Sequence, residues 1–223
     1  YYGEWMPNPY FAKGADEWHF AAGIAYLVAF AKSTWQLFPL LGLGAFGALV
    51  GHTRGVRRLC TYGLLIALGY ALYTTKVGGD FMHYRFAWAP YLCLATAGLV
   101  GLVELARRQP AGASLVALAL GMLSLNPALL EDDYTMQSLE EMHAYTELGR
   151  EVGPALRDQL PSGTIISTTL AGTISYYSGL HVVDQWGLND YEVARGEGLP
   201  RFQRGHYKPA TIEYLRRRKV ELV

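Results

Sequence analysis

Four side chains that can carry charge lie close together in the stretch "TTKVGGDFMHYR", between two long apolar runs. They are Lys76, Asp80, His83 and Arg85. An arginine can bind two phosphate oxygens through parallel hydrogen bonds, and a lysine adds a compact positive charge. Ionisable side chains between apolar runs are candidates for function, because an apolar environment makes them costly to bury. We therefore interpret this stretch as a binding site for an anionic group.

Each of these residues also has a structural interpretation that stays open on the sequence alone. Asp80 and Arg85 could form an ion pair that joins two helices. His83 could be a hydrogen-bonded structural residue. Lys76, at the end of an apolar run, could extend its ammonium group to lipid headgroups.

The elements that must position these residues differ between the two halves of the chain. The 223 residues are 51% hydrophobic and 17% charged, with a mean hydropathy of +0.11. The net charge is +4 up to Leu130 and −4 from Glu131 onward. The first half contains four apolar runs, each near the roughly 20 residues that a membrane-crossing helix needs; they are 35–50, 56–73, 86–106 and 111–130. We predict an α-helical polytopic membrane region over 35–130, followed by a small extracytoplasmic α/β domain over 131–223.

The basic residues give an orientation for this region. Arg54, Arg57 and Arg58 follow the first run, and Arg107 and Arg108 follow the third. Cytoplasmic loops are enriched in Lys and Arg, so these loops are predicted on the cytoplasmic side. By alternation, the Asp80 loop and the C-terminal domain lie outside.

Residues 1–34 are predicted to form an extracytoplasmic loop with an interfacial or re-entrant helix. The apolar segment between His19 and Lys32 is short for a span, although a fifth crossing is the alternative. The "NPYFAK" motif then lies on the same side as the Asp80 loop, which adds Asn8, Tyr10 and Lys13 to the candidate site.

The segment "GLGAFG", residues 42–47, has the letters of a dinucleotide-binding loop. That pattern has its meaning only between a strand and a helix. Inside an apolar run, small residues that let helices approach closely explain it better.

The second half has the pattern of a soluble α/β unit. A long amphipathic helix is predicted up to Pro161. Strands are predicted at "GTIIST", "LHVVD" and "RKVELV", with helical pieces at "LAGTISYYSG" and "PATIEYLRRR". This alternation indicates a small mixed or parallel sheet.

Polar residues follow the second predicted strand. Asp184, Asn189, Asp190 and Arg195 lie where open α/β sheets bind ligands, beyond the carboxyl end of a strand. They are candidates for binding a polar ligand such as a sugar. The alternative is a turn in which Asn and Asp satisfy the backbone.

Four motifs carry a resemblance to a known family: "YYGEWMPNPYFAK", "GGDFMHYR", "SGLHVVDQWGLNDYEVAR" and "GHYKP". Together they resemble bacterial membrane glycosyltransferases of the C-type fold, especially the group with the mycobacterial terminal arabinofuranosyltransferases. The last motif adds His206 and Lys208 to the candidates on the acceptor side. By the same resemblance, the residues of the first two motifs, together with Lys76, are candidates for binding the sugar donor.

The resemblance implies a multi-pass enzyme of the bacterial inner membrane, with its C-terminal domain on the periplasmic side. It would move a sugar, such as arabinofuranose or another pentose or hexose, from a polyprenyl-phosphate donor to a glycan or lipid acceptor. Its partners would be these substrates and membrane lipid, with no nucleic acid. In the family the catalytic base is usually an acidic residue in the first extracytoplasmic loop, which this sequence lacks. The chain therefore resembles a C-terminal portion, and its catalytic residue is unknown.

Further alternatives remain at this stage. Asp80 could orient Arg85, bind sugar hydroxyls or help to coordinate a divalent cation. No other cofactor is predicted. The chain could instead be a non-enzymatic glycan-binding or assembly subunit. A transporter is disfavoured, because no internal repeat is visible.

Overall fold

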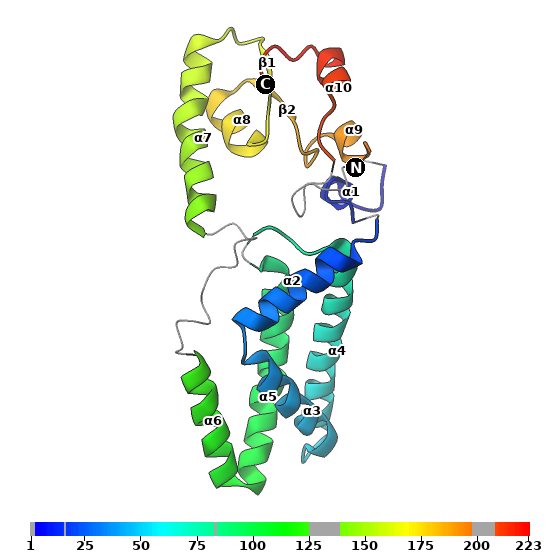
Figure 1. Ribbon diagram of the computed structural model, residues 1–223, viewed down its shortest axis with the longest axis vertical. Coiled ribbons are helices and arrows are strands. Elements are labelled where there is room, and N and C mark those ends of the chain that lie inside the picture. Colours follow the sequence, from blue (N-terminus) through cyan, green and yellow to red (C-terminus); the bar gives the residue numbers. More distant parts are fainter. Residues whose placement is uncertain (1–2, 16, 83, 125–138, 198–207) are drawn as a thin grey trace. The chain divides into compact units, whose positions relative to one another are not determined.

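The computed structural model describes residues 3–15, 17–82, 84–124, 139–197 and 208–223, and it is mostly helical (Figure 1). Chain contacts divide it into two compact units. The helical unit is His19–Met136, and the C-terminal unit combines Tyr1–Trp18 with Gln137–Val223. No pattern in the sequence indicates that the N-terminal segment belongs with the C-terminal region.

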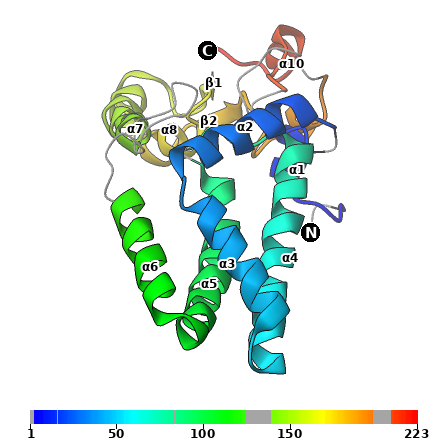
Figure 2. The same cartoon turned by 60° about the horizontal axis from the view of Figure 1, so that its bottom comes forward.

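Within its described residues, the helical unit contains five helices: α2 (Phe20–Ser33), α3 (Leu37–Val50), α4 (Arg54–Val77), α5 (Arg85–Arg108) and α6 (Pro110–Ser124). Helices α3, α4 and α5 pack on one another, while α2 packs on α4 and α6 on α5 (Figure 2). Each of the four predicted apolar runs therefore contains a helix.

Only part of the predicted membrane region meets the requirements of a span among the described residues. Helix α5 is long and apolar enough to cross a membrane. Helices α2 and α3 meet the same test together, but a bend of 93° separates them. Basic residues at both ends and several tyrosines lower the hydropathy of α4, and α6 as described has only 15 residues.

Small residues bring α3 and α5 into close contact. A Cβ atom built on Gly101 would lie 1.8 Å from the carbonyl oxygen of Leu43, and one on Gly47 would lie 3.1 Å from the Gly101 Cα atom. The "GLGAFG" segment lies inside α3. Its predicted role in helix packing is confirmed.

The C-terminal unit contains a small βαβ arrangement. Strands β1 (Ile165–Thr168) and β2 (His181–Asp184) pair in parallel, from Ile165 with His181 to Thr168 with Asp184, and α8 (Ala171–Ser178) connects them. Helix α7 (Leu139–Gln159) covers α8. Glycines permit this contact, since a Cβ on Gly149 would lie 2.3 Å from the Thr173 hydroxyl.

The remaining elements are the short helices α1 (Asn8–Ala12), α9 (Tyr191–Ala194) and α10 (Ile212–Arg217). The predicted third strand is wrong within the described residues, because only Leu222 forms a bridge, with Ile166. Lys219 has a φ of 54°, which turns the backbone just before this point and leaves only a short parallel contact.

The contact between α3 and α5 gives a test of the fold. Replacing Gly101 with Ala should force the helices apart and lower the free energy of unfolding by about 1–3 kcal/mol, the usual cost of overpacking. Gly69→Ala in α4 is the matched control, because a Cβ there meets nothing within 4 Å. Thermal unfolding in detergent, followed by circular dichroism, measures both. Equal melting temperatures would contradict the packing.

Candidate functional site

The turn between α4 and α5 is built by two glycines. Gly78 and Gly79 have φ values of 86° and 84°, and both amides donate to the Thr74 carbonyl, at 3.1 and 3.2 Å. Glycine reaches this left-handed conformation without strain. A Cβ on Gly79 would also lie 2.5 Å from the Tyr26 ring. The glycine pair therefore ends α4 and lets α2 pack against the turn.

Asp80 and Arg85 form an ion pair across this turn. The Arg85 guanidinium lies 2.6 Å from the Asp80 Oδ2 atom. The Asp80 side chain is fully buried, whereas 46% of the Arg85 side chain is exposed. A buried carboxylate is stable only with a charged or hydrogen-bonding partner. Asp80 thus holds the guanidinium through one nitrogen, while about half of the Arg85 side chain stays exposed.

Aromatic rings from α2 hold the start of α5. Tyr84 precedes α5 in a left-handed conformation with φ of 54°, which is unusual for a bulky residue. Its ring lies 5.5 Å from those of Tyr26 and Phe30. The Phe86 amide donates to the Tyr26 hydroxyl at 3.2 Å. These contacts set the position from which Arg85 projects.

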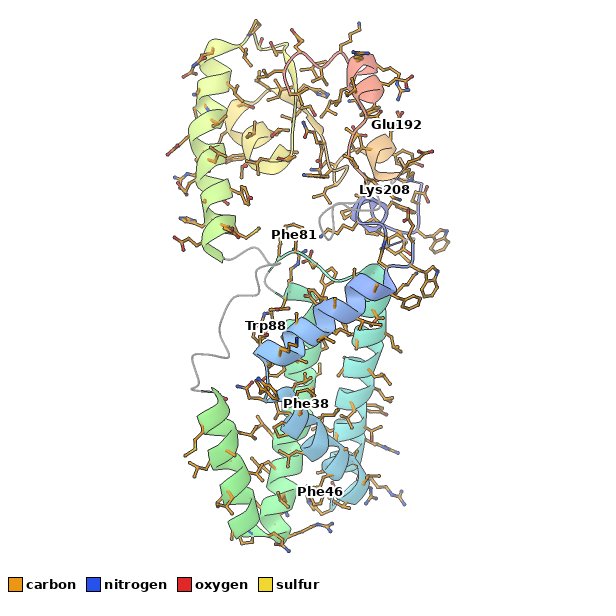
Figure 3. All side chains as sticks on the ribbon, in the orientation of Figure 1. Phe38, Phe46, Phe81, Trp88, Glu192 and Lys208 are labelled. Atoms are coloured by element: carbon orange, nitrogen blue, oxygen red, sulfur yellow. The ribbon has the colours of Figure 1, made fainter. Side chains whose placement is uncertain are left out.

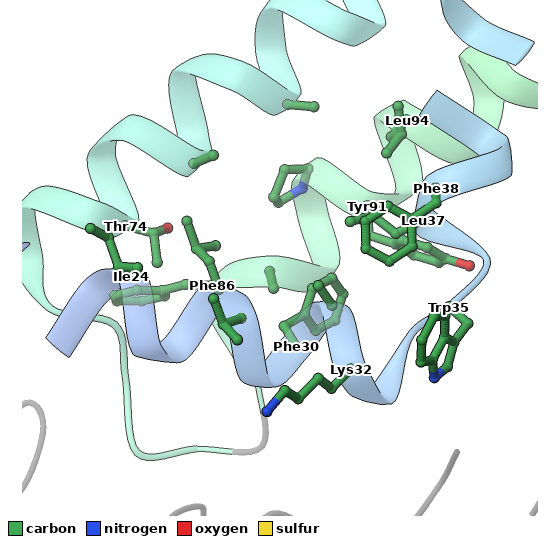
Figure 4. Close-up of a pocket in the computed structure, with 17 residues that line it drawn as sticks. Ile24, Phe30, Lys32, Trp35, Leu37, Phe38, Thr74, Phe86, Tyr91 and Leu94 are labelled. Atoms are coloured by element: carbon green, nitrogen blue, oxygen red, sulfur yellow. The ribbon is translucent and has the colours of Figure 1, made fainter. Parts of the chain in front are cut away.

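An apolar cavity of about 540 Å³ lies between α2, α4 and α5 (Figure 4). This volume is within the roughly 300–1,000 Å³ of typical ligand pockets. Ile24, Thr74 and Phe86 line one part of it, and Tyr91 and Leu94 another, with the Lys32 ammonium at the margin. The Arg85 guanidinium lies 5.5 Å from the centroid of the Phe86 ring, which lines the cavity.

Two other members of the predicted donor group are less closely defined. Lys76 lies in the last turn of α4 and is partly buried, and its carbonyl accepts a hydrogen bond from the His19 amide at 2.8 Å. His83 lies outside the described residues. Of the predicted donor group in this turn, the structure joins Asp80 with Arg85.

In the C-terminal unit, Asp184 organises the loop after β2. Its Oδ1 atom accepts from the Trp186 amide at 2.9 Å, and its Oδ2 atom accepts from the Asn189 amide at 3.0 Å. The Asp184 side chain is buried, while Asn189 is exposed. Asp184 therefore has the role that the turn interpretation predicts, since its side chain holds the backbone of the loop. Of Asp184 and Asn189, only Asn189 has a side chain that is exposed to solvent.

Asp190 has a similar role at the start of α9. Its Oδ1 atom accepts from the amides of Glu192 and Val193, both at 3.1 Å. Its Oδ2 atom accepts from the Tyr214 hydroxyl at 2.5 Å and from Arg218 at 3.2 Å. Asp190 is thus a buried helix cap with both oxygens engaged.

Burial and the Asp190 carboxylate raise the pKa of Tyr214 to about 12, against partial opposition from Arg218. A phenol that donates to a carboxylate resists deprotonation, because a second negative charge would face the first. The hydroxyl therefore stays a donor over the physiological pH range.

Arg195 joins the N-terminal segment to α9. Its Nη1 atom donates to Asn8 Oδ1 at 2.8 Å, and its guanidinium lies 4.1 Å from the Phe11 ring centroid and 3.6 Å from that of Tyr191. Asn8 Nδ2 donates to the Gly187 carbonyl at 3.0 Å. Asn8 and Arg195 come from the predicted donor and acceptor groups, respectively, and the structure brings them together.

The remaining candidates also lie in the C-terminal unit. Tyr10 and Lys13 are partly buried at α1, with the Tyr10 ring 5.3 Å from that of Phe11. Lys208 is buried, with its ammonium 3.8 Å from Glu17, and Figure 3 labels it together with Glu192 on α9. His206 lies outside the described residues.

No group of three His, Cys, Asp or Glu side chains that could hold a metal ion occurs in the part of the chain that the structure describes. The predictions also missed the cavity. Its aromatic lining comes from α2, α3, α5 and the residue Trp35 between α2 and α3. A single apolar residue there resembles any helix face, so only the convergence of these residues identifies the cavity.

Residues 135–223 match a family described as a domain of unknown function, DUF8728. The match covers the C-terminal α/β region and assigns no activity to it. No curated protein and no solved structure matches the chain.

The Asp190 network gives a test that depends on pH. Replacing Tyr214 with Phe removes a hydrogen bond to a charged group and should cost about 1–3 kcal/mol of unfolding free energy. The folded-state pKa of Tyr214 is raised, so its stabilisation is complete below pH 10, the ordinary tyrosine pKa, and is lost as the pH rises through about 12. The difference between wild type and Tyr214→Phe should therefore shrink above pH 10.

Urea unfolding of the full chain from neutral pH to pH 11.5 measures this difference. Tyr176→Phe is the control, because Tyr176 is 81% exposed. A difference between wild type and Tyr214→Phe that is constant with pH would contradict the raised pKa.

Proposed function

We propose that the chain is part of a membrane glycosyltransferase that uses a polyprenyl-phosphate sugar. In this proposal the helical unit binds the lipid phosphate of the donor, and the C-terminal unit faces the acceptor outside the membrane. The observation that carries the proposal is the apolar cavity that begins beside the half-exposed Arg85. A polyprenyl phosphate has the matching chemistry, since its anionic group is attached to a long apolar chain.

The surface of the helical unit supports a membrane location. Large apolar side chains are exposed along its helices, including Leu41, Leu65, Leu92, Leu99 and Leu118. Water-soluble proteins rarely expose so many together. Trp35, which follows α2, and Trp88, in the first turn of α5, are also exposed, as aromatic residues at a membrane interface are. We therefore propose that α3 to α6 are the spans and that α2 lies at the outer interface.

The charges of the turn fit the chemistry of donor cleavage. When the bond between sugar and phosphate breaks, negative charge grows on the phosphate that leaves. A cation already held in place stabilises this charge in the transition state without further reorganisation. Arg85 would bind the phosphate, and Asp80 would position Arg85. The residue that deprotonates the acceptor is not assigned.

In the C-terminal unit, we propose that fewer residues contact the acceptor than the sequence predicts. The carboxylates of Asp184 and Asp190 hold backbone amides, so they shape the loop and would act as positioning residues. The exposed Asn189 amide and the exposed Tyr191 ring are the groups that could contact a glycan. We propose that the acceptor reaches these two side chains.

Variants of Arg85 test the phosphate contact. Arg85→Ala should weaken binding of decaprenyl phosphate by about 10- to 100-fold, the equivalent of about 1.5–3 kcal/mol for a hydrogen bond to a charged group. Arg85→Lys should recover only part of this, because a point charge does not replace the planar guanidinium. Fluorescence titration of the full chain in detergent gives the affinities. Arg150→Ala in α7 removes an exposed arginine elsewhere and should change nothing.

The double variant Asp80→Asn/Arg85→Ala separates binding from structure. If Arg85 serves only to neutralise Asp80, removing both charges should restore affinity. If Arg85 binds the phosphate, affinity should stay low. Restored affinity would overturn the proposed contact between Arg85 and the phosphate. A sugar-transfer assay on membranes that contain the intact protein addresses the enzymatic role. Binding of decaprenyl phosphate without sugar transfer would favour a non-enzymatic role.

The cavity is tested by filling it. Ala71→Phe places a ring into the apolar cavity and should remove the preference for a long prenyl chain, so that decaprenyl and geranyl phosphate bind equally. Ala119→Phe on the exposed face of α6 is the control. A chain-length preference that survives in Ala71→Phe would show that the prenyl chain binds elsewhere.

A further inference from the structure

A second hollow, of about 280 Å³, lies between α3 and the start of α4. Ala48 lines it from α3, and Arg54, Arg57, Arg58, Thr61 and Tyr62 line it from α4. It shares no lining residue with the donor cavity, and the 24 residues of α4 separate Arg54 from the turn that holds Asp80 and Arg85. At a rise of 1.5 Å per residue, that length is about 36 Å.

The charge around this hollow is strongly positive. Arg54, Arg57 and Arg58 are all exposed. Among the described residues, neither Arg54 nor Arg58 forms an ion pair, and Arg57 donates to the Gly51 carbonyl at 3.0 Å. The nearest acidic residue of the adjoining α5 end, Glu104, is buried against His52 at 2.6 Å. The Glu104 carboxylate is therefore already paired with the His52 ring.

The backbone adds to this positive field. The Thr53 hydroxyl caps α4 by accepting from the Val56 amide at 3.2 Å, and the first helical bond runs from the Arg57 amide to the Thr53 carbonyl at 3.2 Å. The amides of Arg54 and Gly55 precede that bond and point out of the helix. The positive end of the α4 dipole therefore coincides with the arginines.

An apolar ridge continues from the arginines along α4. Arg58, Tyr62 and Ile66 are spaced by four residues, so successive side chains adjoin and form a ridge that is inclined to the helix axis. Tyr62 is 59% exposed and Ile66 is 49% exposed. This face of α4 thus presents cations at the end of the helix, then a hydroxyl-bearing ring, and then aliphatic surface.

We infer that this face binds an anionic phospholipid, with the headgroup phosphate at Arg54 and Arg58 and an acyl chain along Tyr62 and Ile66. Basic pockets between membrane helices bind such headgroups, and each arginine near the surface contributes about 1 kcal/mol. The inference rests on the membrane location proposed above, but it requires neither the donor site nor sugar transfer. Arg54 and Arg58 should bind an anionic phospholipid more tightly than a phospholipid with no net charge.

Lipid retention tests this inference directly. The full chain is purified in a mild detergent and mixed with equal amounts of POPG and POPC, and the bound lipids are identified by native mass spectrometry. Wild type should retain POPG over POPC by about 10- to 30-fold, as two arginines predict. Arg54→Gln/Arg58→Gln should remove this preference. Ala48→Leu, which fills the hollow and keeps the charges, should lower POPG retention as well.

Two controls separate this site from general charge and from the donor site. Arg150→Gln/Arg157→Gln removes the same charge from α7 and should leave POPG retention unchanged. Arg85→Ala should also retain POPG, so failure of the donor proposal would leave this result intact.

The inference is overturned if wild type retains both lipids equally or if Arg54→Gln/Arg58→Gln keeps the preference. It is also overturned if glycerol 3-phosphate displaces POPG, since the site would then bind a soluble phosphate.

Discussion

The pairing of a buried Asp80 with a half-exposed Arg85 is the constraint on which the helical unit depends. A carboxylate without solvent needs its charge balanced, so the turn between α4 and α5 must bring a cation back to it. Gly78 and Gly79 supply the left-handed backbone that makes this return short. Tyr84 adopts a conformation that is costly for its type, and contacts with the rings of Tyr26 and Phe30 stabilise it.

This constraint links local structure to a binding site. Phe30 of α2, whose ring packs on that of Tyr84 in the turn, also lines the apolar cavity, so the turn and the cavity share part of their packing. A change in the turn would therefore alter both the charge and the shape of the proposed phosphate site. At the other end of α4, three arginines adjoin a smaller hollow with no comparable buried partner. The two ends differ because one cation is held by a buried acid and the others face solvent.

Much of the secondary structure followed from sequence patterns. Apolar runs predicted the four helices α3 to α6, and β-branched runs predicted β1 and β2, because these periodicities depend on local geometry. The predicted strand at the C-terminal end was wrong, since a left-handed Lys219 is not visible in composition. The roles of Asp184 and Asp190 were ambiguous because the same residue types cap turns and bind sugars. The contact of Asn8 with Arg195, like the cavity, depends on long-range packing that one sequence does not encode in any local pattern.

The central claim is that the cavity beside Arg85 holds the first isoprene units of a polyprenyl phosphate. Photocrosslinking tests it most directly, with a decaprenyl phosphate that carries a diazirine on its first isoprene unit and mass spectrometry to locate the label. The account predicts labels on α2 and on the first turns of α5, around Phe86 and Tyr91, that excess unlabelled decaprenyl phosphate removes. Labels spread evenly over the exposed faces of α4 and α6, unaffected by competitor, would contradict it.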